Sequence, residues 1–178
     1  TPVNDPPVAL NNNYTTNEDQ TLTVPTGTGV RANDNDNADN NPVTSLTVST
    51  SPVVNVAHGT LTLSGDGSFV YVPTSNYCGP DSFQYRVCDS GTPLPSLCDT
   101  ATAYITVNCL NDPPVVVDTP IVTCEDCGPT TVCIPVTDPD VNQSYTIAAQ
   151  FCGPNSGTAS SSLVLGTLCV TYTANTNF

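Results

Sequence analysis

Carboxylates are the most abundant side chains capable of chemistry in this chain of 178 residues. Sixteen Asp and Glu stand against two basic residues, Arg31 and Arg86, and the formal net charge is -14. Carboxylate oxygens bind hard divalent cations such as calcium, which takes about six to eight oxygen ligands. No single short segment supplies that many, so a cation site needs several segments. The same charge repels phosphate backbones and anionic membrane surfaces, which excludes nucleic-acid binding and disfavours membrane association.

The remaining reactive side chains are nine cysteines and one histidine. Because His58 is the only histidine, zinc-finger spacing with histidine is excluded, and an all-cysteine zinc site at Cys124, Cys127 and Cys133 stays an alternative. No nucleophile elbow accompanies His58, and a domain of this size has little room for a glycosidase cleft. The sequence therefore predicts a protein that is not an enzyme. Disulfides are the preferred interpretation of the cysteines, and they indicate an oxidising, extracellular location.

An internal repeat organises the chain. The hexapeptide VNDPPV at residues 3–8 recurs as LNDPPV at residues 110–115, and an Asp-x-Asp motif stands at residues 34–36 and 138–140. We predict two repeats, residues 1–109 and residues 110–178. The second is expected to be incomplete, because counterparts of the last two strands of the first repeat are missing. The chain is thus expected to be a fragment of a longer tandem array.

The elements that must position these side chains are β-strands. Seventeen prolines and eleven glycines interrupt the chain too often for long helices. Apolar residues alternate with polar ones over residues 82–88 and 101–107, which gives each strand one buried face. Further strands are predicted at residues 21–24, 44–49, 60–64 and 68–72, the last two joined by a turn at Gly65–Gly67. About seven short strands in roughly 100 residues predict an all-β, immunoglobulin-like sandwich.

The two longest predicted strands also align four cysteines. Partner numbers in an antiparallel pair have a constant sum, so Cys88 opposite Cys98 brings Cys78 and Cys109 within one residue of each other. We predict the disulfides Cys88–Cys98 and Cys78–Cys109, each contributing roughly 2–4 kcal/mol. In the second repeat we predict Cys152–Cys169. Cys124, Cys127 and Cys133 stay unassigned, and free thiols remain the alternative.

The order of these motifs resembles the cadherin-like tandem repeats of large bacterial surface adhesins. Each repeat begins with Asn-Asp-Pro-Pro and continues with Glu-Asp and Asp-x-Asp. The first repeat then has GDGSFVYVP at residues 65–73, YCGPDSFQY at 77–85, CDSGTP at 88–93 and DTATAYITV at 99–107. The resemblance implies tandem immunoglobulin-like (cadherin-like) β-sandwich repeats.

In that family calcium binds where consecutive repeats meet, and the resemblance implies one or two ions at this junction. The implied ligands come from the first repeat, the linker and the second repeat: Glu18 and Asp89, Asn111 and Asp112, and Asp138 and Asp140. A second set would serve the neighbouring junctions, with Asn4, Asp5, Asp34 and Asp36 at the preceding one and Glu125 and Asp126 at the following one. Two alternatives stay open: the acids are solvated turn residues, or residues 33–41 form a self-contained loop site.

We therefore expect a segment of a long secreted or surface-anchored adhesin or fibre, which calcium and disulfides extend and stiffen. The expected partners are neighbouring repeats, further copies in a fibre, and a cell-surface or glycan ligand of the full-length protein. One alternative is a carbohydrate- or receptor-binding module. Core or edge packing is the preferred interpretation of Tyr14, Tyr77 and Tyr104, and a sugar-stacking platform is the alternative. Another alternative is an accessory domain of a secreted enzyme.

Overall fold

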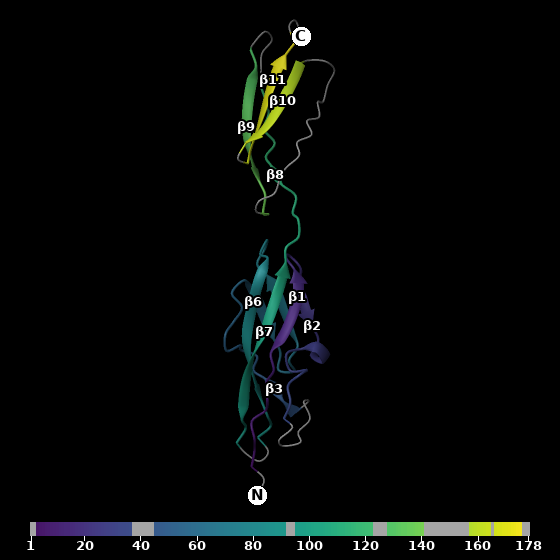
Figure 1. Ribbon diagram of the computed structural model, residues 1–178, viewed down its shortest axis with the longest axis vertical. Coiled ribbons are helices and arrows are strands. Elements are labelled where there is room, and N and C mark those ends of the chain that lie inside the picture. Colours follow the sequence, from purple (N-terminus) through teal and green to yellow (C-terminus); the bar gives the residue numbers. More distant parts are fainter. Residues whose placement is uncertain are drawn as a thin grey trace. The chain divides into compact units, whose positions relative to one another are not determined.

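The computed structural model describes residues 3–36, 45–91, 95–122, 128–140, 157–164 and 166–175 (Figure 1). The chain divides into two units, residues 1–110 (unit 1) and residues 111–178 (unit 2). The described residues contain no helix with the length and apolarity that a membrane crossing requires.

The described residues of unit 1 form two β-sheets. The first sheet has the strand order β1-β7-β6-β3, formed by Asn12–Asn17, Cys98–Asn108, Gly79–Cys88 and Thr47–Val48. The second sheet has the order β2-β5-β4, formed by Leu22–Val24, Phe69–Pro73 and Gly59–Leu63, and a short 3-10 helix η1, Thr26–Thr28, follows β2. Figure 1 shows β1, β7 and β6 side by side. The predicted all-β sandwich fold is confirmed.

The core of unit 1 draws on both sheets. Phe69 and Tyr71 come from the second sheet and Phe83, Tyr85 and Ile105 from the first, and all five are almost fully buried. The rings of Phe69 and Phe83 meet edge to face, with centroids 5.3 Å apart. Burial alternates along β6 and β7 as their sequences predict. Each buried large apolar side chain contributes about 1.5–3 kcal/mol, so this core holds the two sheets together.

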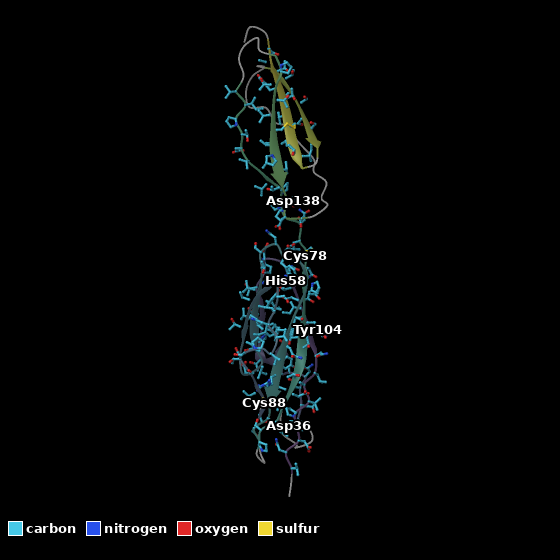
Figure 2. All side chains as sticks on the ribbon, turned by 90° about the vertical axis from the view of Figure 1, so that its left-hand side faces the viewer. Asp36, His58, Cys78, Cys88, Tyr104 and Asp138 are labelled. Carbon is cyan, nitrogen blue, oxygen red and sulfur yellow. A yellow bond between two sulfur atoms is a disulfide. The ribbon has the colours of Figure 1, made fainter. Side chains whose placement is uncertain are left out.

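The hairpin of β6 and β7 sets the positions of four cysteines. The strands pair antiparallel from Gly79 opposite Val107 to Cys88 opposite Cys98. Both predicted disulfides of unit 1, Cys88–Cys98 and Cys78–Cys109, are present. Figure 2 shows Cys88 and Cys78 toward opposite ends of this unit. The two disulfides therefore close the hairpin at both of its ends.

Strand β1 is an element that the sequence did not predict. It pairs parallel with β7, from Asn12 opposite Ala103 to Asn17 opposite Asn108. Its sequence is NNYTTN, in which Tyr14 is the one residue with a large apolar side chain. The rings of Tyr14 and Phe69 meet edge to face, with centroids 4.9 Å apart. Strand β1 is thus defined by its edge position beside β7, because its own residues have no apolar alternation.

The described part of unit 2 is one sheet of order β10-β11-β9-β8, formed by Gly157–Val164, Thr167–Ala174, Thr130–Thr137 and Val115–Val116. Cys169 of β11 lies opposite Cys133 of β9 and is bonded to it. The predicted Cys152–Cys169 disulfide is therefore wrong. The alternative zinc site is wrong as well, because the sulfur of Cys133 is in this disulfide.

One hairpin feature occurs in both units. Gly59 begins β4 beside Tyr71 of β5, and Gly157 begins β10 beside Tyr172 of β11. A Cβ on Gly59 would lie 2.6 Å from a ring carbon of Tyr71, and one on Gly157 would lie 2.5 Å from the Tyr172 hydroxyl oxygen. Glycine is needed where a tyrosine ring lies this close to the backbone. This shared arrangement supports the internal repeat.

Candidate functional site

The predicted ligands of unit 1 separate into two groups at opposite ends of its β6–β7 hairpin. We call the end where β6 stops and β7 starts the proximal end, and the end where β1 and β7 stop the distal end. Figure 2 places Asp36 and Cys88 toward the proximal end and His58 and Cys78 toward the distal end. Strand β6 has 10 residues, and at about 3.3 Å per residue the two ends lie roughly 30 Å apart.

Asn4 occupies the proximal end. Its Nδ2 donates to Asp89 Oδ2 and to the Pro95 carbonyl oxygen, both at 2.9 Å. The Asn4 side chain is more than nine-tenths buried, and its Oδ1 has no hydrogen-bond partner among the described residues. A buried carbonyl oxygen without a donor costs about 1–3 kcal/mol. The site therefore holds an oxygen that is free to bind a cation.

Asp89 also lies at the proximal end, which corrects its predicted place. It follows Cys88 directly and is buried against Asn4, whereas the predicted grouping with Asn111 and Asp112 requires the distal end. The physical reason is strand direction: β6 runs antiparallel to β7, so the end of β6 lies beside the start of β7. The predicted register, with Cys88 opposite Cys98, already implies that Asp89 lies beside the start of β7.

The Asp89 carboxylate is kept ionised by its neighbours. Its Oδ1 accepts hydrogen bonds from the Gly91 amide at 2.7 Å and the Leu97 amide at 3.1 Å. Burial acts to raise the pKa of Asp89, but the amides of Leu97, Asn4 and Gly91 outweigh burial and lower that pKa below its ordinary value of 3.8. A carboxylate in this state offers a full negative charge to a cation.

Asp34 and Asp36 are further buried carboxylates of unit 1. Asp34 accepts from the Leu10 amide at 2.8 Å and from the Tyr85 hydroxyl at 2.9 Å. Burial nevertheless raises the pKa of Asp34 above 3.8, and the nearby Asp99 adds to that rise. The buried charge of Asp34 is thus unfavourable, and a bound cation would offset it. Asp5, which is predicted to act together with Asn4, Asp34 and Asp36, is exposed.

The chemistry of this donor set fits calcium. Asn4, Asp34, Asp36 and Asp89 are all buried, and three of the four carry carboxylates. The chain holds only two arginines and no lysine, and Arg31 Nη1 donates to the Leu46 carbonyl oxygen. Calcium prefers carboxylate and amide oxygens of this kind. Residues 37–41 of the alternative loop site lie outside the described residues.

The distal end of unit 1 presents Glu18. This side chain is buried, and its Oε1 accepts a hydrogen bond from the Leu110 amide. The Glu18 amide in turn donates to the Asn108 carbonyl oxygen at 2.9 Å. These bonds fix Glu18 beside the residues with which unit 1 ends.

Unit 2 holds the remaining predicted ligands that the structure describes. The Asp112 amide donates to Asp140 Oδ2 at 2.6 Å, and the Asp140 amide donates to Asp138 Oδ1 at 2.8 Å. Asn111 is exposed, and its Nδ2 donates to the Asp112 carbonyl oxygen at 3.2 Å. The Asp-x-Asp motif thus contacts the Asn-Asp-Pro-Pro motif within this unit. Glu125 and Asp126 lie outside the described residues.

The aromatic residues proposed as a sugar platform do not share a surface. Tyr14 faces the core, and burial together with the charge of Asp34 raises its pKa to about 12. Tyr104 stands opposite Asn13 and is 48% exposed. Tyr77 stacks on His58, with ring centroids 4.0 Å apart. Because Tyr14 and Tyr104 alternate to opposite faces of the sheet, they cannot hold one sugar ring together.

Comparisons with known proteins identify the family. A family model described as bacterial cadherin-like domain matches residues 4–109. The chain belongs to this family. A search among curated protein sequences found no significant match.

The cadherin-like fold is also found in solved structures. Extracellular cadherin domains 1–4 of protocadherin gamma B7 match with a TM-score of 0.57 and 20% identity, over 98% of this chain and 43% of that one. The protocadherin gamma B7 EC3-6 cis-dimer structure matches with a TM-score of 0.56 and 16% identity, over 97% of this chain and 40% of that one. The human desmocollin-1 ectodomain matches with a TM-score of 0.50 and 17% identity, over 97% of this chain and 34% of that one. This cadherin-like chain therefore spans less than half of each of these structures.

Proposed function

We propose that this cadherin-like chain is a structural, adhesive repeat segment of a long extracellular adhesin or surface fibre. Calcium at the ends of its repeats and disulfides within them extend and stiffen the array. Family membership supports a repeat function, and the likeness to extracellular cadherin domains supports an extracellular location. The proposal depends above all on the buried, unpartnered Oδ1 of Asn4 beside the ionised Asp89.

At the proximal end we propose that Asn4, Asp36 and Asp89 bind calcium and that Asp34 adds negative charge. Calcium would supply positive charge where buried carboxylates otherwise repel one another. The side chains contribute oxygen atoms that the fold already holds in place, through the Asn4–Asp89 bond and the Gly91 and Leu97 amides. Asp5, exposed and next to Asn4, would face the preceding junction.

We also propose, from the resemblance to cadherin-like repeats, that Glu18, Asn111, Asp112, Asp138 and Asp140 are ligands of a second calcium site, which we call the junction site. Glu18 is bound to the Leu110 amide, and Asp112 is bound to Asp140. Covalent geometry keeps the Cα atom of Asp112 within about 8 Å of that of Leu110, because consecutive Cα atoms are about 3.8 Å apart. Calcium bound by these side chains would restrict the flexibility of the chain. We also propose that unit 2 is a second repeat of the same kind.

Calorimetric titration of the chelator-treated chain with calcium tests this proposal. We expect binding with a Kd of about 0.1–1 mM, the range of extracellular modules. Asp36→Asn is expected to weaken the proximal site and Asp112→Asn the junction site, each by about tenfold or more, because a charged ligand is lost. Small-angle X-ray scattering should show a narrower range of chain extensions when calcium is added.

The matched control is Asp66→Asn. Asp66 lies on the exposed turn between β4 and β5, where it accepts hydrogen bonds from Thr26 and Ser68. Its substitution removes the same charge from unit 1 and should leave both affinities unchanged. Absence of binding heat up to about 10 mM calcium, well above the range for extracellular modules, would refute the calcium proposal. If Asp36→Asn, Asp112→Asn and Asp66→Asn all weaken calcium binding equally, the binding reflects the overall charge of the chain and the proposed sites are refuted.

A further inference from the structure

We propose that the Cys88–Cys98 disulfide positions the proximal cation site, so that this bond controls calcium affinity as well as stability. The inference deepens the proposed function and rests on the calcium binding proposed above. It starts from sequence adjacency: Cys88 immediately precedes Asp89, and Cys98 immediately precedes Asp99. The disulfide therefore closes the segment 89–97 at the proximal end of the β6–β7 hairpin.

The described parts of the closed segment, residues 89–91 and 95–97, are its two arms, and both contact Asp89. The Gly91 and Leu97 amides both donate to Asp89 Oδ1. The Asp89 amide donates to the Leu97 carbonyl oxygen at 3.1 Å, and Ser96 Oγ donates to the Asp89 carbonyl oxygen at 3.0 Å. Gly91 has a φ of +67°, and a Cβ there would lie 2.5 Å from the Ser96 nitrogen. Close approach of the two arms thus depends on glycine at position 91.

The same segment also orients Asn4. Both acceptors of the Asn4 Nδ2 group, Asp89 Oδ2 and the Pro95 carbonyl oxygen, belong to the closed segment. A third anchor lies next to Cys98, where Asp99 Oδ2 accepts from the Ala9 amide at 3.0 Å. Because the amide group of Asn4 is planar, fixing Nδ2 with two acceptors also fixes the direction of Oδ1. The direction of the free oxygen is therefore set by contacts that the disulfide closes.

Opening the disulfide would leave the two arms of this segment joined by hydrogen bonds alone. Cys88 and Cys98 form the last pair of the β6–β7 ladder, and beyond them the described arms are joined by the Asp89–Leu97 backbone hydrogen bond and by the side-chain hydrogen bonds of Asp89 and Ser96. Calcium would then have to order the segment and Asn4 at the moment of binding, which lowers affinity. The Cys78–Cys109 disulfide closes the other end of the same hairpin and contacts none of these groups through the bonds described above. It is the matched control.

The test uses the full chain carrying Asp112→Asn, which leaves the proximal site as the measured one. Calcium affinity is compared among this background, Cys88→Ser with Cys98→Ser, and Cys78→Ser with Cys109→Ser. We expect the first pair to weaken binding by about tenfold or more and the second pair to change it less than about twofold, since only the first loosens the site. A further variant, Gly91→Ala, disturbs the segment with the disulfide intact and should weaken binding in the same direction.

Hydrogen exchange without calcium provides a readout that is independent of binding. The Gly91 and Leu97 amides should exchange faster in the Cys88/Cys98 variant and in Gly91→Ala, with Phe83 and Tyr85 still protected, and should keep their rates in the Cys78/Cys109 variant. Unchanged affinity and protection in the Cys88/Cys98 variant would overturn the inference while calcium binding stands. If this variant does not fold, unchanged affinity in Gly91→Ala overturns it. If the background itself binds no calcium, the proposed function fails at this end, and the positioning of the calcium site fails with it.

Discussion

Asp81 is the side chain whose replacement should destabilise unit 1 most clearly. Its carboxylate accepts four hydrogen bonds within a buried position: from the amides of Ala57 and His58 at 2.9 Å, from the Ser82 amide at 2.8 Å and from the Tyr71 hydroxyl at 2.9 Å. These bonds tie the segment before β4 and the core residue Tyr71 to β6. We predict that Asp81→Asn, a substitution of equal size, weakens this connection by removing part of these hydrogen bonds.

The expected loss in the free energy of unfolding follows from the number of hydrogen-bond donors that lose their acceptor. An asparagine keeps one acceptor oxygen and turns an N–H₂ group toward the donors on the other side, so two of the four donors lose their acceptor. Each hydrogen bond to a charged group contributes about 1.5–3 kcal/mol, which gives a loss of about 3–6 kcal/mol. A loss of 3 kcal/mol lowers the melting temperature of a domain of this size by about 12 °C or more.

Urea unfolding of the full chain measures this loss, with hydrogen exchange of β4, β5 and β6 separating unit 1 from unit 2. Asp66→Asn is the control, because Asp66 also accepts several hydrogen bonds but is exposed, and its loss should stay below about 1 kcal/mol. A loss below about 1 kcal/mol for Asp81→Asn, or equal losses in both variants, would refute the reasoning that buried charged hydrogen bonds decide the stability here.

Three further predictions concern packing, pH and calcium. Gly59→Ala should cost about 1–3 kcal/mol in urea unfolding, because its Cβ would lie 2.5 Å from the Val72 carbonyl oxygen, whereas Gly27→Ala, with open space around it, should stay within about 0.5 kcal/mol. Burial acts to raise the pKa of Asp81, but the amides of Ala57, His58 and Ser82 and the Tyr71 hydroxyl hold it below 3.8. The stability from this ionised group is therefore present above pH of about 4 and lost as pH falls through the lower folded pKa, so acid should destabilise the wild-type chain more than Asp81→Asn. Calcium at about 100 times its Kd should raise the free energy of unfolding by about 2.7 kcal/mol. A melting temperature that does not change when calcium is added would contradict this prediction.

Much of unit 1 follows from local pattern. The alternation of Phe83, Tyr85 and Val87 marks the buried face of β6, because successive side chains of a strand point to opposite faces. The constant sum of partner numbers in an antiparallel pair then aligns the cysteines of the β6–β7 hairpin, and the Cys88–Cys98 and Cys78–Cys109 disulfides are both present. The repeated acidic motifs predict cadherin-like repeats, and the family model that matches residues 4–109 confirms this prediction.

Features that depend on strands distant in sequence needed the tertiary structure. Strand β1 has no apolar alternation and exists because β7 offers it a parallel edge. The Cys133–Cys169 disulfide joins β9 and β11, which are neighbours in space although β10 lies between them in sequence. Sequence order therefore gave no reason to pair these cysteines.

The amino-acid sequence by itself determined which side chains offer oxygen atoms and which strands form the longest hairpin, since both depend on residue type and a period of two. Only the tertiary structure decided how the proposed ligands are grouped. It placed Asp89 with Asn4, far from Glu18, and left Asn4 Oδ1 buried without a partner. The physical reason is that burial and unmet hydrogen bonds arise from segments that meet only when the sandwich closes.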